Sequence, residues 1–125
     1  MKNYRDLIVW QKSIGLVINL YRLTDRFPKN EFFGIVAQIR RSAVSIPSNV
    51  AEGFGRKSDK EFIRFLKIAM GSIFELQTQI YISFGLNFIN QETYEGIYSA
   101  SREVEIMLKT LINKITTCPN SSFCK

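Results

Sequence analysis

Apolar residues recur at alternating steps of three and four along four separate segments of the chain. This spacing places each set on one face of an α-helix. No strand-like alternation bounded by hairpin turns is present. We therefore expect an all-α protein whose four helices bury these rows: Leu7, Trp10, Ile14, Val17, Tyr21 and Thr24; Phe32, Val36, Ile39, Ala43, Ile46 and Val50; Phe62, Leu66, Ala69, Ile73, Leu76 and Ile80; Ile97, Ser101, Val104, Leu108, Leu111 and Ile115.

Residues that favour helix ends lie between these segments. Pro28 is expected to end the first helix and the segment 53–55 the second, because proline and glycine interrupt helices. Gly85 is expected to cap the end of the third helix. We predict N-caps for the second, third and fourth helices at Asn30, Ser58 and Asn90. Short connections make successive helices antiparallel, which gives an up-down-up-down four-helix bundle.

The 125 residues correspond to one domain. We assign residues 1–117 to the bundle and 118–125 to a flexible C-terminal tail that contains Pro119 and polar residues. Pro47 lies inside the expected second helix, where it lacks a donor for the preceding turn. It either kinks that helix or ends it near Ser45. The continued apolar spacing through Val50 favours a kink.

Two helices carry a second apolar row besides the one assigned to the core. The first-helix row and the third-helix row could simply widen the core. Together, however, they would leave a large apolar patch on a monomer, which favours a homo-oligomer. The number of subunits does not follow from this pattern. The candidate interface residues are Val9, Leu16, Leu20 and Leu23 in the first helix, and Ile63, Met70, Phe74 and Tyr81 in the third.

Positive charge is concentrated in one part of the chain. Lysine and arginine number 17 against 11 acidic residues, a net charge of +6. This balance favours an acidic partner, nucleic acid first. Four basic residues that we call the basic row step along the third helix, and they either face phosphates or form a solvated face. The candidate nucleic-acid-binding residues are Arg40, Arg41, Arg56 and the basic row, Lys57, Lys60, Arg64 and Lys67.

Polar residues in the second helix are expected to form a structural network. Arg41, Ser45, Asn49 and Glu52 lie on one helical face and can bond to one another. The chain has no histidine, which removes the commonest general base and the His-containing triads and zinc sites. Glu52 alone makes a poor active site, so we expect no catalysis.

Several further classes of site and location are not expected. Cys118 and Cys124 are too few for a tetrahedral zinc site and are expected to be reduced thiols. We expect no metal, no cofactor and no small-molecule substrate. No apolar run is long enough to span a membrane, and no signal peptide follows Met1, so we expect a cytoplasmic protein.

Three segments carry a resemblance to a known family: QIRRSAVSIPSNVAEGFGR, the following SDKEFIRFLKIAMGSIFEL, and the opening DLIVWQKS. They resemble the bacterial four-helix-bundle family named for the 23S rRNA intervening sequence, over about residues 4–115. The resemblance implies a homopentameric barrel of antiparallel bundles with no settled biochemical activity. The accessory protein of diversity-generating retroelements, which pairs with a reverse transcriptase, is similar in fold. The residues that match motif positions are Arg40, Arg41, Asn49, Glu52 and Arg56.

Two functions remain open at this point. The first is an oligomeric, non-enzymatic scaffold that binds nucleic acid, with RNA favoured, through phosphate contacts. The second is a protein-interaction module whose partner is an acidic protein.

Overall fold

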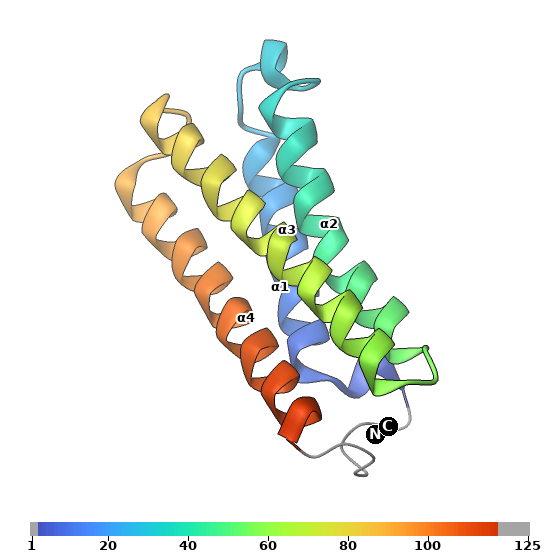
Figure 1. Cartoon of the computed structure of the whole chain (residues 1–125). Coiled ribbons are helices and arrows are strands. Elements are labelled where there is room, and N and C mark those ends of the chain that lie inside the picture. The colour runs from blue at the N-terminus through green and yellow to red at the C-terminus, as the bar shows by residue number, and fades with distance from the viewer. Residues whose placement is uncertain (1–2, 118–125) are drawn as a thin grey trace.

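Four α-helices make up most of the computed structural model, which describes residues 3–117 (Figure 1). Successive helices run in opposite directions, and no strand occurs within residues 3–117. This confirms the all-α, four-helix architecture. The elements are a 3-10 turn η1 (Tyr4–Asp6), α1 (Ile8–Thr24), a 3-10 turn η2 (Lys29–Glu31), α2 (Ile35–Phe54), α3 (Asp59–Gly85) and α4 (Gln91–Thr117).

The core rows predicted for α2, α3 and α4 are confirmed with two exceptions. Phe32 is exposed and Ile97 is half-buried, whereas every other residue of these three rows is buried. Among the pairs of neighbouring helices, α2 and α3 pack together most extensively, and α1 and α4 least. The packing of α2 against α3 is therefore the largest helix–helix interface of the bundle.

The prediction for α1 is partly wrong: Leu7 and Thr24 of the predicted core row are buried, but most of the row offered as an interface is buried as well. Val9, Leu16 and Leu20 are buried in the core of the subunit and are not available as an oligomer interface. Trp10 is only half-buried, and Tyr21 is exposed. The core-facing row of α1 also contains two buried hydroxyls. Ser13 and Thr24 donate to the helix carbonyls of Trp10 and Leu20, at 2.8 Å and 2.7 Å. Because these hydroxyls are satisfied within the helix, they can be buried in the core.

The other members of the candidate interface are divided between core and surface. Leu23, Ile63 and Met70 are half-buried and pack against the core. These three residues therefore widen the core of the subunit, which is the alternative to an oligomer interface. Phe74 and Tyr81 are exposed. Self-association through the third-helix row stays a prediction for these two residues alone.

The start of α2 differs from the prediction, whereas its course through Pro47 does not. Asn30 lies in the separate turn η2, and α2 begins at Ile35. The helix continues past Pro47, which is buried, and ends at Phe54. The alternative in which the helix stops near Ser45 is therefore wrong, and the apolar spacing through Val50 was the better indicator.

The predicted caps of α3 and α4 are confirmed at their N-termini. Ser58 Oγ accepts a hydrogen bond from the Glu61 backbone N–H at 3.1 Å, and Asn90 Oδ1 accepts one from Thr93 at 2.8 Å. The end of α3 is different, since Gly85 is its last helical residue and Asn87 adopts φ 64°. The N–H of Phe88 then donates to Ser83 O at 2.9 Å. Asn87 supplies the left-handed turn of a Schellman motif.

The predictions about a membrane span and about the C-terminal tail have different outcomes. No helix within residues 3–117 is long and apolar enough to cross a membrane. The tail 118–125, with Cys118 and Cys124, lies outside the described residues, and so do residues 1–2. The bundle itself extends over the described part of the predicted domain 1–117.

Candidate nucleic-acid interface

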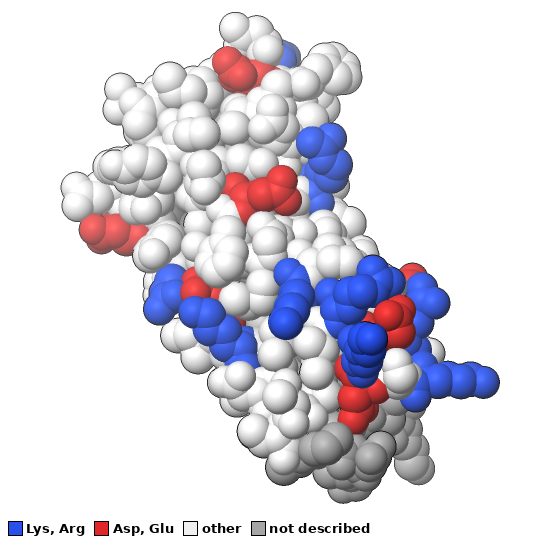
Figure 2. Space-filling model, viewed as in Figure 1, with Lys and Arg blue, Asp and Glu red and all other residues white. Residues whose placement is uncertain are grey.

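Basic side chains gather around the first turns of α3 and over the middle of α4, in the lower half of the view in Figure 2. Lys60, Arg64 and Lys67 lie on the exposed face of α3, away from its buried row. Lys57 is also exposed, but it precedes the Ser58 cap and so belongs to the α2–α3 connection. The basic row is thus one lysine in a connection followed by three residues on a helix.

The three lysines of the basic row differ from its arginine in their partners. Lys57, Lys60 and Lys67 form no ion pair within residues 3–117. Arg64 Nε lies 3.2 Å from a Glu61 carboxylate oxygen. This hydrogen bond lowers the pKa of Glu61 and raises the pKa of Arg64. No acidic side chain of the described chain forms an ion pair with these lysines, although the charge of Lys60 also helps to lower the pKa of Glu61.

Two arginines meet at one aromatic ring beside the basic row. The guanidinium groups of Arg56 and Arg64 lie 4.9 Å and 4.6 Å from the centroid of the half-buried Phe65 ring. Arg56 also pairs with Glu52 at 2.9 Å. Both arginines keep about half of their side-chain surface in solvent, so they can contact a further anion. Their acidic partners reduce, but do not cancel, the positive charge at this end of the bundle.

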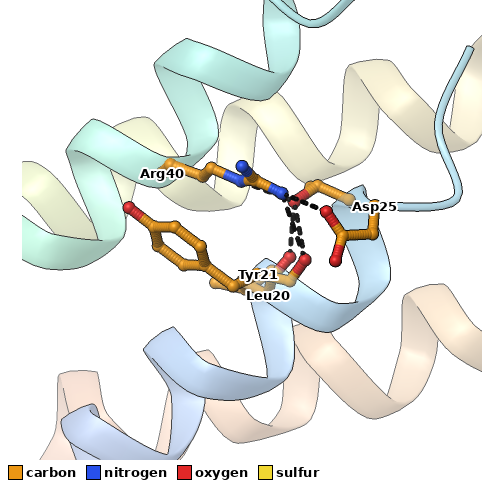
Figure 3. A network of polar contacts seen from close by, with 5 residues as sticks. Leu20, Tyr21, Asp25 and Arg40 are labelled. Atoms are coloured by element: carbon orange, nitrogen blue, oxygen red, sulfur yellow. Dashed lines mark hydrogen bonds and ion pairs between the residues drawn. The ribbon is translucent and has the colours of Figure 1, made fainter. Parts of the chain in front are cut away.

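Arg40 is a structural residue, because its guanidinium is engaged with residues at the end of α1 (Figure 3). Its side chain is only 16% exposed and reaches from α2 to the end of α1. It donates to Thr24 Oγ1 at 3.0 Å, to the Tyr21 carbonyl at 3.2 Å and to Asp25 Oδ1 at 2.9 Å. Its guanidinium carbon also lies 4.4 Å from the centroid of the Tyr21 ring. Arg40 is therefore removed from the candidate nucleic-acid-binding residues.

Arg41, the next residue, points elsewhere. It is exposed and forms no ion pair within residues 3–117. It borders a shallow hollow between α1 and α2 that Tyr21 and Val44 also line. Arg41 therefore stays available for an anion, but it is not part of the group formed by the basic row and Arg56.

The predicted polar network exists with a changed membership. Asn49 Nδ2 donates to the carbonyl and the hydroxyl of Ser45, at 2.8 Å and 2.9 Å. The hydroxyl of Ser72, on α3, donates to Ser45 Oγ at 2.8 Å. Glu52 is not part of this network, because it pairs with Arg56. The network fastens α2 to α3, as a structural role requires.

A buried carboxylate, Glu105 of α4, was missed by the sequence reasoning. It accepts from Gln77 Nε2 on α3 at 3.0 Å and pairs with Arg102 at 2.7 Å and Lys109 at 3.1 Å. Burial raises the pKa of Glu105, but these hydrogen bonds outweigh burial and hold that pKa below its ordinary value. The spacing of Arg102 and Lys109 around Glu105 was the available signal. The hydrogen bond from Gln77 ties α4 to α3, whereas the three charged side chains all lie on α4.

Carboxylates and thiols are not assembled into a metal-binding group in the described chain. No cluster of three or more cysteine, aspartate or glutamate side chains that could hold a metal ion occurs within residues 3–117. The chemistry of this surface is that of exposed cations beside aromatic rings. Such a surface suits the binding of polyanions.

Comparisons with known proteins agree on the family and the fold. A model of the 23S rRNA-intervening sequence protein family matches residues 5–110. The structure is similar to the 1.70 Å crystal structure of a protein of unknown function from the S23 ribosomal protein family of Bacteroides thetaiotaomicron. The TM-score is 0.79 at 26% sequence identity, over 85% of this chain and 96% of that chain. No curated protein matches. The chain therefore belongs to the 23S rRNA-intervening sequence protein family.

Proposed function

We propose that this protein is a non-enzymatic, cytoplasmic scaffold that binds nucleic acid through phosphate contacts. The observation that carries the proposal is the exposure of Lys57, Lys60 and Lys67, which form no ion pair in the described chain. Lys60 and Lys67 stand on a helix that is capped at its start and buried along its opposite face. Their ammonium groups are therefore presented from a rigid support.

The binding mode follows from the kind of residues at this surface. Lysine contacts phosphate as a point charge, and each contact releases counterions condensed on the nucleic acid. Arg56 and Arg64 add donors, but a phosphate must compete there with Glu52 and Glu61. Phosphate contacts carry no sequence information, so we expect binding that tolerates many sequences. RNA is favoured because the family is named for an intervening sequence of 23S rRNA.

Assembly into a homo-oligomer, a pentamer by family resemblance, is part of the proposal. It is supported by large apolar side chains that stay exposed in the subunit, among them Ile18 and Tyr21 of α1 and Val44 of α2. Several copies of one weak basic surface on one assembly would bind a polymer more tightly than a single copy. Multi-angle light scattering measures the mass directly, and a monomer at micromolar concentration would remove this part of the proposal.

The proposal is tested with a labelled single-stranded RNA and fluorescence anisotropy at low salt. One variant replaces Lys60, Arg64 and Lys67 with Gln, which removes three charges and keeps good helix formers. A matched control replaces three exposed basic residues at the other end of the bundle, Arg22, Arg26 and Lys29, with Gln. Both variants have the same net charge.

The proposal expects weaker binding from the first variant and near-normal binding from the second. An absence of binding by the unmodified protein at low salt contradicts it. The acidic-protein partner then becomes the better account of the positive charge. Equal losses in both variants also contradict it, because they would show a dependence on net charge and not on this surface.

A further inference from the structure

The exposed face of α3 changes character along its length. Residues at alternating steps of four and three form one outer row that is exposed throughout: Lys60, Arg64, Lys67, Gly71, Phe74, Thr78 and Tyr81. The first half of this outer row is basic, and the second half is aromatic or small. From Lys60 to Tyr81 the outer row extends about 30 Å at 1.5 Å per residue. The two halves are thus parts of one continuous strip.

Tyr81, at the end of the aromatic half, is held in place by neighbouring rings. Tyr94 of α4 stacks on Phe84 of α3 with centroids 4.9 Å apart and planes at 14°. Tyr81 lies edge-on to Tyr94 at 5.9 Å, and Tyr98 stacks on Tyr94 at 5.8 Å. These contacts hold the rings of Tyr81 and Tyr98 in place, so their ordering on binding costs little further entropy.

The outer rings nevertheless keep much of their surface in solvent. Tyr81 is 62% exposed, Phe74 is 46% exposed and Tyr98 is 39% exposed. Exposed aromatic side chains grouped in this way are unusual on a surface that faces only water. A partner with flat, apolar faces would cover them favourably.

The distribution of charged residues along this face distinguishes between single-stranded and duplex nucleic acid as partners. Glu75 follows Phe74 directly on α3, and Glu95 lies three residues before Tyr98 on α4, both exposed. The upper half of this face is otherwise mostly uncharged in Figure 2. Phosphates are therefore favoured over the basic half and disfavoured over the aromatic half. A duplex keeps its base faces stacked inside and its phosphates outside, so it suits only the basic half.

We propose that the outer row of α3 binds single-stranded nucleic acid, with phosphates on Lys60, Arg64 and Lys67 and unpaired bases stacked on Phe74 and Tyr81. Tyr98 of α4 flanks the same stacking surface. Every base has an aromatic face, so such stacking tolerates sequence and adds to the phosphate contacts. This inference rests on the proposed nucleic-acid function and narrows it to single strands.

The test compares three ligands of equal length: a labelled single-stranded RNA, its duplex, and an abasic strand that keeps the phosphates. The variant Phe74→Ala with Tyr81→Ala removes the exposed rings from helical positions that favour alanine. The control, Ile68→Ala with Ile82→Ala, removes exposed apolar side chains from α3 outside the outer row. Anisotropy gives each affinity, and light scattering gives each mass.

The inference expects the unmodified protein to bind the single strand more tightly than the duplex. The aromatic variant should lose at least about fivefold in affinity for each stacking contact removed, with an unchanged salt dependence. It should bind the abasic strand like the unmodified protein. The control should behave normally with all three ligands.

Two results would overturn the inference and leave the proposed function standing. One is duplex binding as tight as single-strand binding, with no effect of the aromatic variant. The other is a smaller assembly for the aromatic variant, with equal losses for all three ligands, which would make Phe74 and Tyr81 a contact between copies of this chain. Failure of the unmodified protein to bind any ligand at low salt would instead overturn both.

Discussion

Replacing Arg40 with Gln tests the assignment of this residue to the structure of the bundle. The change removes the guanidinium that bonds to the Tyr21 carbonyl and to Thr24 Oγ1. Each bond contributes about 1 kcal/mol. The ion pair with Asp25 adds less than about 1 kcal/mol, because that carboxylate is 71% exposed. The contact with the Tyr21 ring adds about 0.5–1 kcal/mol. We therefore expect Arg40→Gln to lower the free energy of unfolding by about 2.5–4 kcal/mol.

Urea unfolding followed by circular dichroism measures this loss at one fixed protein concentration. A loss of this size corresponds to a fall of about 10–15 °C in melting temperature for a chain of this length. The matched control is Arg41→Gln, which changes an exposed neighbour with no ion pair within residues 3–117. It should change stability by less than about 0.5 kcal/mol. Equal stability of the two variants would refute the structural role of Arg40.

Three further substitutions test the packing, the buried charge and the helix end. Gly53→Ala should lower stability by about 1–3 kcal/mol in urea unfolding, because its Cβ would lie 2.7 Å from Phe65 Cβ; Gly15→Ala, with nothing within 4 Å, should be neutral or stabilising. The pKa of Glu105 is lowered from its ordinary value of 4.5, so the charged carboxylate stabilises the fold at pH values above 4.5. This stabilisation is lost as the pH falls below 4.5 and the carboxylate becomes protonated. Glu105→Gln should make the fall in melting temperature on acidification shallower, and an unchanged acid profile would contradict this. Asn87→Ala should lower the melting temperature because φ at this position is 64°, whereas Asn87→Gly should not.

The helical architecture could be predicted because most apolar rows were unambiguous. In α2 and α3 the residues assigned to the core row within the helix are the ones that the structure buries, even though α3 also carries a second apolar row. In α1 two apolar rows competed, and sequence spacing could not decide between them. The row that includes Val9 and Leu20 is interrupted by the polar residue Ser13. Only the structure shows that the Ser13 hydroxyl is satisfied by the carbonyl of Trp10.

The site was predictable where it depends on helical spacing and not where it depends on contacts between helices. Lys60, Arg64 and Lys67 share the exposed face that their spacing indicated. Arg40 looked like a member of the same charge cluster, but its partners are in α1, 15 to 19 residues earlier in the chain. Glu105 likewise depends on Gln77, which lies on another helix. Such pairings follow from the packing of the helices, which a single sequence does not specify.

The salt dependence of RNA binding is the measurement that tests the central claim most directly. Plotted as log affinity against log salt, the slope changes by about 0.7 for each phosphate contact to a single strand. If the basic row contacts phosphates, replacing Lys60, Arg64 and Lys67 with Gln should make the slope shallower by about 2. Glu61→Gln should tighten binding, because it frees Arg64 from its acidic partner. The Arg22, Arg26 and Lys29 control should keep the original slope. A slope that is the same in the unmodified protein and the basic-row variant would contradict the claim that this surface binds nucleic acid.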